Sequence, residues 1–380
     1  MRNPFDNEER IAFRETVRKF TAAEITPYVD AWDEQGEFPE SLRRKAGELG
    51  LFGFGIDESY GGLGFDDYFM RASSSEELAR SSGGGVLASI WCCNIMTGPI
   101  QLLASEDIKR RVLPPIMSGE VGGSLAVTEP GGGSDVANLR TTAKRDGDSW
   151  VLNGAKTFIT GGMRSKYFLV GARTGASGLM GISLFLVEAD TPGFTRTLID
   201  RKMGWWASDT TQLFFEDCRI PAENLVGEVD HGFMAIVNNF NNERFAMVAQ
   251  MLGFAKTCFE ESVKYARDRE TFGKPLIGHQ AIRHKLAEMS ARIDMMESYV
   301  NQISWLFNEG ENPFAEVTKA KFQCSKDLEW IVNESMQILG GAGYLRGHPV
   351  ERIYRDCKVQ SIGGGSQEVM KDLAIKLMML

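Results

Sequence analysis

The order in which two residue patterns follow one another is the feature of this 380-residue sequence that most constrains its fold. Residues 1–120 carry apolar residues at helical spacing, residues 121–228 form short β-branched and aromatic segments separated by Gly, Asp, Asn and Pro, and residues 229–380 return to long amphipathic patterns. We therefore predict an α+β protein, mainly α, with an N-terminal helical domain, a central β domain and a C-terminal helical domain. A doubly wound nucleotide-binding fold is disfavoured, because its strands and helices alternate throughout.

Within the central domain the pattern predicts strands at Ser124–Val127, Trp150–Thr160, Tyr167–Val170, Ile182–Val187 and Gln212–Phe215. Gly83-Gly84-Gly85 follows a helical pattern rather than a strand, so a helix–helix turn is favoured there over a phosphate-binding loop.

Composition excludes several classes of protein. A net charge of −9 is unlike the basic face of a nucleic-acid-binding protein. The six cysteines form no CxxC pair and the four histidines have no ligand spacing, so we expect reduced thiols and no metal site. No run of 18 uninterrupted apolar residues is present, so no membrane span is expected. The N-terminus has no apolar targeting segment, which predicts a cytoplasmic protein, or one of the mitochondrial matrix if a presequence has been removed.

Two glycine-containing segments of the central domain are candidate binding sites. In Leu125–Asp135 (LAVTEPGGGSD), successive glycines let backbone N–H groups approach a ligand and Thr128 and Ser134 offer hydroxyls, although a plain surface turn fits equally well. Asn153–Gly162 (NGAKTFITGG) reads as a hairpin turn at Asn153-Gly154 that feeds a strand, on which a flat ring could stack.

Three further segments lie in the C-terminal domain. In Arg267–Leu276 a helix stops, and Arg269 suits a pyrophosphate, although a solvated helix end is favoured on the residues alone. Gln337–Tyr344 (QILGGAGY) and Ile362–Glu368 (IGGGSQE) are glycine clusters between helices. Backbone could lie against a cofactor in each, or each could simply cap a helix.

Taken together, VTEPGGGSD, KTFITGG, ERFAM, RDRETFGKPL, QILGGAGY and GGGSQE stand in an order that resembles the acyl-CoA dehydrogenase family over essentially the whole chain. The resemblance implies that family's fold, with a barrel-like central β domain and a C-terminal four-helix bundle, in a homotetramer. It also implies FAD as cofactor, oxidation of the Cα–Cβ bond of a fatty acyl-CoA to the trans-2-enoyl-CoA, and electron-transfer flavoprotein as acceptor.

The resemblance also assigns binding roles. It implies that the flavin is held by Leu125, Val127, Thr128, Gly133, Ser134, Phe158, Ile159 and Thr160. The adenine dinucleotide part would be held by Arg269, Thr271, Phe272 and Gln280, with Gln337, Gly340 and Gly341 reaching over from a neighbouring subunit, and Ser366 and Glu368 would complete the site. The substrate would contact Ser134, Asn241, Arg244, Gly364 and Gly365.

The catalytic base is the main departure from the family pattern. Many members carry a glutamate in the final motif, where this chain has Gly364. Glu243 lies on the apolar stripe of the predicted helix 233–265, seven residues after Ile236 and four before Met247, where burial makes a carboxylate a better proton acceptor. Periodicity alone equally allows a marginal Glu paired with an Arg or Lys. The resemblance to the isovaleryl and long-chain branch favours Glu243 as the base, with hydride passing from Cβ to flavin N5.

The same resemblance implies that the thioester carbonyl accepts hydrogen bonds from the Gly364 N–H and a flavin ribityl hydroxyl. Rival functions are an oxidase, an enoyl-CoA reductase or a desulfinase of the same fold, or a silent flavin or acyl-CoA binding protein. Relatives often carry Arg where this chain has Trp206, and the sequence offers no physical account of that change.

Overall fold

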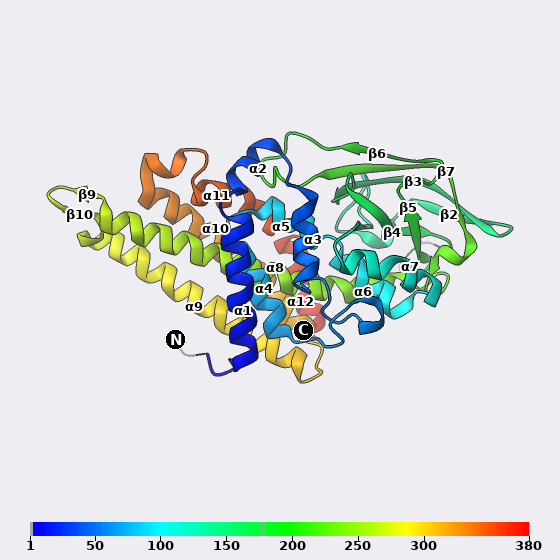
Figure 1. Cartoon of the computed structure of the whole chain (residues 1–380), viewed down its shortest axis with the longest axis horizontal. Coiled ribbons are helices and arrows are strands. Elements are labelled where there is room, and N and C mark those ends of the chain that lie inside the picture. The colour runs from blue at the N-terminus through cyan, green and yellow to red at the C-terminus, as the bar shows by residue number, and fades with distance from the viewer. Residues whose placement is uncertain (1–2, 177, 179, 380) are drawn as a thin grey trace.

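The computed structural model describes residues 3–176, 178 and 180–379, and within them the order of helices, strands and helices is as predicted (Figure 1). The chain begins with helices that lie between the sheet and the long C-terminal helices. Their bounds are α1 Glu8–Phe20, η1 Thr21–Ile25, α2 Val29–Gln35, α3 Glu40–Glu48, η2 Glu58–Tyr60, α4 Tyr68–Ala79, α5 Gly84–Trp91, α6 Asn94–Leu103 and α7 Glu106–Met117. The predicted helix–helix turn is present between α4 and α5, but only Gly83 lies in it, because Gly84 and Gly85 are the first two residues of α5.

The central domain is one eight-stranded sheet, in the order β6-β7-β3-β2-β4-β5-β8, with β1 paired to β4. Its strands are β1 Gly122–Ala126, β2 Thr142–Asp146, β3 Ser149–Thr160, β4 Ser165–Arg173, β5 Ile182–Glu188, β6 Phe194–Leu198, β7 Thr210–Pro221 and β8 Leu225–Val226; the short helices η3 Val136–Asn138 and η4 Ala222–Asn224 lie between them. All five predicted strands are present. The five segments do not include β2, β6 and β8. Strands β2 and β6 are largely exposed and polar and so lack the apolar signal that marks a strand, and β8 is only two residues long.

The prediction of a hairpin turn at Asn153-Gly154 is wrong. Both residues lie inside β3, and the turn that joins β2 to β3 is at residues 147–148. Gly154 has φ +147° at an irregularity in the pairing of β3 with β7, and a Cβ there would lie 2.7 Å from the Thr141 Cα. The Asn-Gly pair therefore marks a bulge with close backbone approach, which in sequence looks like a turn.

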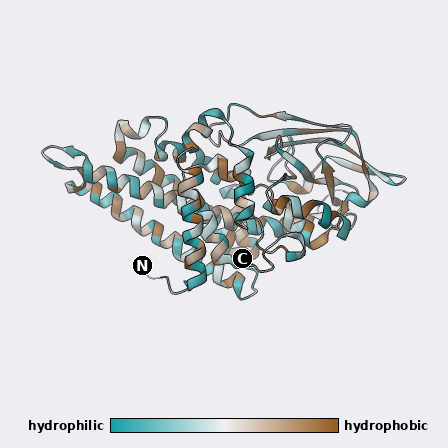
Figure 2. Cartoon of the chain, in the orientation of Figure 1, coloured by the Kyte–Doolittle hydropathy of each residue, from teal (hydrophilic) through white to brown (hydrophobic). Residues whose placement is uncertain are grey.

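The C-terminal domain packs five helices: α8 Gly232–Asp268, α9 Gln280–Asn308, α10 Phe314–Leu339, α11 Pro349–Gln360 and α12 Gln367–Leu377. The small elements β9 Glu270–Thr271, β10 Lys274–Pro275, η5 Leu276–Gly278 and η6 Gly340–Tyr344 connect them. Hydrophobic and hydrophilic residues alternate along the long helices, as one buried face requires (Figure 2). In Figure 1, α8 runs from the body of the molecule to the β9–β10 hairpin at the end opposite the sheet.

One stretch among the described residues, Gly84–Leu103, is long and apolar enough by length and composition to cross a membrane. It consists of α5 and α6, which are separated at Cys92 and Cys93, and 56% of its most apolar window is buried inside the protein. Such burial is typical of core helices.

Candidate active site

Glu243 lies in the middle of α8, on the face that carries the buried side chains of Ile236, Met247 and Met251. The residue as a whole is only partly buried, so some of its surface remains accessible. Burial raises the pKa of Glu243, while the nearby Arg244 and Lys321 charges lower it. Among the described residues no hydrogen bond or ion pair within 4.0 Å involves this carboxylate. The alternative of a marginal, ion-paired glutamate is therefore not what the structure contains.

The final glycine motif forms the turn between α11 and α12, beside this part of α8. Gly364 has φ +64°, and a Cβ there would lie 2.7 Å from the Met247 Sδ and 3.9 Å from the Arg244 Cγ. The turn at Gly364 therefore packs against the helix turn that carries Glu243. The Gly364 N–H donates to no protein acceptor in the described part of the chain, and so it is free for a ligand.

Two cations bind the carbonyl groups of this turn. Arg244 Nε donates to the Gly364 carbonyl over 2.8 Å, and Lys321 Nζ donates to the Gly365 carbonyl over 2.5 Å. The sequence analysis missed Lys321. Its signal is a lysine on the buried stripe of α10, four residues after Val317 and three before Cys324.

Asn241 lies half a turn before Glu243 and is 2% exposed. Neither its Oδ1 nor its Nδ2 atom has a hydrogen-bond partner among the described residues. An unsatisfied buried amide costs free energy, about 1–3 kcal/mol for each group. Unpartnered polar atoms in a buried side chain are rare, and they point to a ligand that supplies the missing partners.

A buried ion pair fixes the first glycine segment, Leu125–Asp135. Lys156 in β3 is 0% exposed and donates to Glu129 Oε1 over 2.8 Å and to the Val127 carbonyl over 3.0 Å. Glu129 also accepts the backbone N–H groups of Arg140 and Thr141. These contacts hold residues 127–129 rigid, while no atom lies within 4 Å of where a Cβ would be on Gly131 or Gly132.

The end of β3 runs beside this segment, since the Thr157 N–H donates to the Thr128 carbonyl over 2.9 Å. Phe158 has φ +57° and is 67% exposed, a strained and exposed conformation for an aromatic residue. Ile159 is buried beneath it and Thr160 is half-buried. The side-chain hydroxyls of Thr128, Ser134 and Thr160 make no hydrogen bond within the described chain, so they are available to a ligand. Leu125 is half-buried, and Val127 is buried in the core.

The residues expected at the dinucleotide part lie elsewhere. Arg269 directly follows α8, 26 residues after Glu243, which at 1.5 Å per residue is roughly 39 Å away. Thr271 and Phe272 lie in the adjoining hairpin, where Phe272 is 97% exposed, and Gln280 begins α9. Gln337, Gly340 and Gly341 are exposed at the end of α10. A single chain therefore does not bring these residues together with Phe158, and Figure 1 shows the hairpin far from the sheet.

Ser366 and Glu368 lie at the start of α12. The Ser366 hydroxyl caps the helix by accepting the Val369 N–H over 3.4 Å, and Glu368 is exposed in its first turn. Hence Ser366 has a structural role whether or not it also touches a ligand.

Trp206 joins the central domain to the helices. Two guanidinium groups lie over its ring, with the Arg355 Cζ at 3.8 Å and the Arg346 Cζ at 4.5 Å from its centroid. Its Nε1 donates to the Lys202 carbonyl over 2.8 Å. An indole is thus favourable here through cation–π contacts, whereas an arginine would face two like charges.

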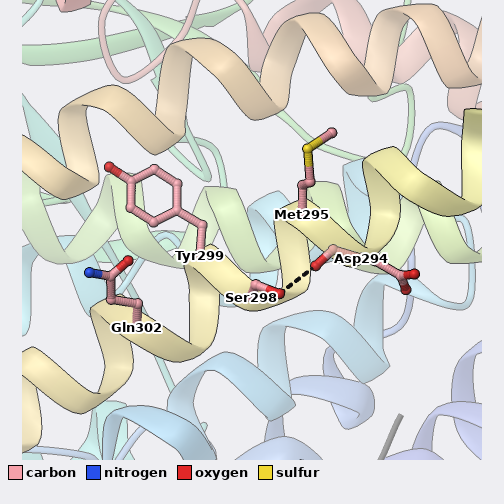
Figure 3. A pocket seen from close by; sticks show the side chains of 5 residues that line it. All are labelled: Asp294, Met295, Ser298, Tyr299 and Gln302. Carbon is pink, nitrogen blue, oxygen red and sulfur yellow. Dashed lines mark hydrogen bonds between the residues drawn. The ribbon is translucent and has the colours of Figure 1, made fainter.

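A separate surface hollow of about 370 Å³ lies on α9. Its lining side chains all come from this one helix: Asp294, Met295, Ser298, Tyr299 and Gln302 (Figure 3). This hollow is an open helix face that contains none of the residues singled out by the sequence.

Comparison with known proteins gives one family over the whole chain. The models of the acyl-CoA dehydrogenase N-terminal, middle and C-terminal domains match residues 7–120, 124–218 and 230–379. The mitochondrial long-chain specific acyl-CoA dehydrogenase of Rattus norvegicus is 38% identical, over 98% of this chain and 87% of that protein.

Solved structures give the same result. A putative acyl-CoA dehydrogenase from Mycobacterium smegmatis superimposes with a TM-score of 0.96 at 41% identity, over 99% of both chains. A glutaryl-CoA dehydrogenase from the same organism, in complex with FADH2, has a TM-score of 0.92 at 29% identity, over 98% of this chain and 95% of that one. A chain from a structure described as the electron transferring flavoprotein of Acidaminococcus fermentans has a TM-score of 0.94 at 32% identity, over 99% of both chains.

Proposed function

The chain belongs to the acyl-CoA dehydrogenase family, and from that membership we propose that it oxidises a fatty acyl-CoA to the trans-2-enoyl-CoA with Glu243 as the base. Family membership makes the protein an acyl-CoA dehydrogenase, an oxidoreductase that uses FAD. When bound, FAD supplies the hydride acceptor of the reaction. The chain itself must bind the thioester, polarise its carbonyl group and remove the α-proton.

Proton removal is proposed for Glu243. Its carboxylate is desolvated and has no fixed partner among the described residues, so it can approach a substrate carbon and gain basicity from burial. The charges of Arg244 and Lys321 oppose this rise in its pKa, which favours the ionised form that a base requires. The absence of a side chain at Gly364 is consistent with this role, because the turn packs directly against the α8 segment that carries Glu243.

Carbonyl polarisation is proposed for the Gly364 N–H, which no protein acceptor in the described chain occupies. A preorganised donor aimed at a developing enolate oxygen stabilises the transition state, and mutational losses of one such donor are about 2.7–4 kcal/mol. We propose that Asn241, whose two amide atoms have no partner among the described residues, binds the thioester arm. Arg244 acts through Gly364, and Gly365 and Ser134 complete the proposed substrate contacts.

The residues fit the FAD that the family requires. Thr128, Ser134 and Thr160 carry free hydroxyls, Gly133 leaves the backbone accessible, and Phe158 presents an exposed ring. Leu125 is half-buried, and Val127 and Ile159 are buried in the same two segments. We propose that these hold the flavin, and that Ser366 and Glu368 extend the site.

The dinucleotide end would be completed by other subunits. Arg269, Thr271, Phe272 and Gln280 lie too far from the flavin segment to serve the same cofactor in one chain, and Gln337, Gly340 and Gly341 are equally exposed at that end. A homotetramer would place these groups over a neighbour's FAD and cover Phe272. Electron-transfer flavoprotein is the proposed acceptor, since dehydrogenases of this kind pass electrons to a protein, and a cytoplasmic location remains a prediction.

The single observation that carries this proposal is the desolvated Glu243 beside the free Gly364 N–H. A panel of acyl-CoAs, mixed anaerobically with the holoenzyme, tests it by bleaching of the flavin absorbance. Bleaching by at least one saturated acyl-CoA, with slow reoxidation by oxygen, is expected. A protein that no acyl-CoA bleaches would be a silent binding protein. Fast turnover with oxygen would identify an oxidase, and reaction only of reduced flavin with enoyl-CoA would identify a reductase.

A further inference from the structure

Lys321 is a fully buried cation, with 0% of its surface exposed, on the helix α10 that packs against α8 and α12. A buried ammonium group is costly unless it is paired or hydrogen-bonded. Its hydrogen bond in the described chain goes to the Gly365 carbonyl, over 2.5 Å. The lysine therefore binds the glycine turn, and no carboxylate lies within 4.0 Å of it among the described residues.

The neighbouring carbonyl is bound in the same way. Arg244 Nε donates to the Gly364 oxygen over 2.8 Å, and on the other side the Gly363 N–H donates to the Val359 carbonyl over 2.7 Å. Gly364 and Gly365 have φ +64° and +107°, conformations that glycine adopts freely and leaves as easily. The anchored groups on both sides fix the direction of the Gly364 N–H, which a glycine turn would not do alone.

Lys321 also acts on the proposed base through its charge. The charges that lower the pKa of Glu243 are those of Arg244, on the same helix, and of Lys321 on α10, whose Nζ binds the turn that packs against this part of α8. Burial lowers the pKa of Lys321 to about 8, with Arg244 acting in the same direction and Glu243 against it. Two cations therefore oppose the rise in the pKa of the carboxylate that is proposed as the base.

We infer that Lys321 is a positioning residue of the reaction: it anchors the Gly365 carbonyl, which helps to orient the Gly364 N–H, and its positive charge favours the ionised form of Glu243. This inference rests on the proposed role of Glu243. Two substitutions distinguish the hydrogen bond of Lys321 from its charge. Lys321→Met removes both the hydrogen bond and the charge, whereas Lys321→Gln removes the charge but leaves an amide donor for Gly365.

The test measures Glu243 directly in the substrate-free holoenzyme. Its carboxyl absorption in the infrared is identified as the band lost in Glu243→Gln, and its titration is followed with pH. Both Lys321 variants are expected to move the midpoint upward by about one pH unit, equivalent to ~1.4 kcal/mol. The matched control is Lys256→Met, since Lys256 lies on α8 but pairs with Glu76 and Glu297. In this variant the titration midpoint of Glu243 should equal that of the wild type.

Flavin reduction by an acyl-CoA gives the second readout. Lys321→Met should be roughly tenfold slower or more at neutral pH, and Lys321→Gln should recover part of that loss. An unchanged Glu243 midpoint in both variants would overturn the inference, because a merely structural lysine would affect stability alone. Failure of the proposed function looks different: Glu243→Gln would then reduce its flavin at the normal rate, whatever Lys321 does.

Discussion

Arg244 donates from Nε to the carbonyl oxygen of Gly364 over 2.8 Å, which joins two positions 120 residues apart. The bond ties the helix turn that carries Glu243 to the glycine turn that carries the free N–H. A base and an oxyanion donor must hold a fixed separation to act on adjacent atoms of one substrate. This hydrogen bond therefore keeps Glu243 and Gly364 in one site, although many relatives carry a glutamate where this chain has Gly364.

Gly364 allows a test of whether the catalytic carboxylate can be moved from position 243 to position 364. In a Glu243→Gly background, Gly364→Glu should restore part of the rate of flavin reduction, because the turn at Gly364 packs against the helix turn that carries residue 243. The gain should be small at first, since the residue needs φ +64° and its Cβ would lie 2.7 Å from the Met247 Sδ. Adding Met247→Val, which removes that atom, should raise the recovered rate. No recovery in either variant would mean that the turn does not approach the substrate.

Arg269→Ala should weaken retention of FAD without unfolding the protein. The Arg269 side chain is exposed and makes no contact in the described chain, whereas its backbone bonds to Tyr265 and Leu276 are unaffected by truncation. A charge-assisted phosphate contact contributes ~1.5–3 kcal/mol, so the dissociation constant should rise roughly ten- to hundredfold. Equilibrium dialysis measures this, with Arg267→Ala as the control. Equal affinity in both variants, or release of FMN, would count against the assignment.

Much of the fold could be predicted from the sequence because buried strands and amphipathic helices carry strong patterns. The five apolar strands and the long helix around Glu243 are examples. The exposed strands β2 and β6 carry no such pattern, and the bulge at Gly154 has the residues of a turn. The site was harder to predict, because its contacts join residues that lie far apart in the sequence. Nothing local to Lys321 indicates that it binds Gly365, and no residue near Trp206 in sequence indicates the two arginines over its ring.

Trp206→Arg should destabilise the holoenzyme. The substitution replaces two cation–π contacts, with Arg355 and Arg346, by a third guanidinium group beside them, at a cost of ~1–3 kcal/mol. Thermal unfolding measures the change. Trp206→Phe keeps an aromatic face and should lie closer to the wild type, although it loses the bond to the Lys202 carbonyl. Equal melting temperatures for Trp206→Arg and the wild type would show that the two cation–π contacts do not stabilise the protein.

Asp356→Asn should stabilise the protein relative to the wild type by an amount that grows as the pH rises. Burial raises the pKa of Asp356 to about 7, aided by Asp33 and opposed by Arg355 and Arg352. The folded state therefore holds this proton more tightly than the unfolded state, and the resulting stability is lost as the pH rises from about 4 to about 7. Asparagine stays neutral and can still accept the Trp205 N–H through Oδ1.

The measurement for this prediction is the melting temperature of Asp356→Asn relative to the wild type at pH 5 and pH 8. The difference should grow by roughly 2–5 °C in favour of the variant. Asp190→Asn, at an exposed position, is the control. A difference that shrinks with pH would show that Asp356 is ionised and stabilising in the folded protein.

The central claim, that Glu243 removes the substrate's α-proton, is tested most directly by the rate of flavin reduction in Glu243→Gln. Glutamine keeps the shape of the side chain but cannot take the proton, so anaerobic reduction by an acyl-CoA that bleaches the wild type should slow by ~10²–10⁴-fold. FAD content should be unchanged, and Glu260→Gln, an exposed position on the same helix, should react normally. Reduction of Glu243→Gln at the wild-type rate would contradict the account and make the glutamate a structural residue of α8.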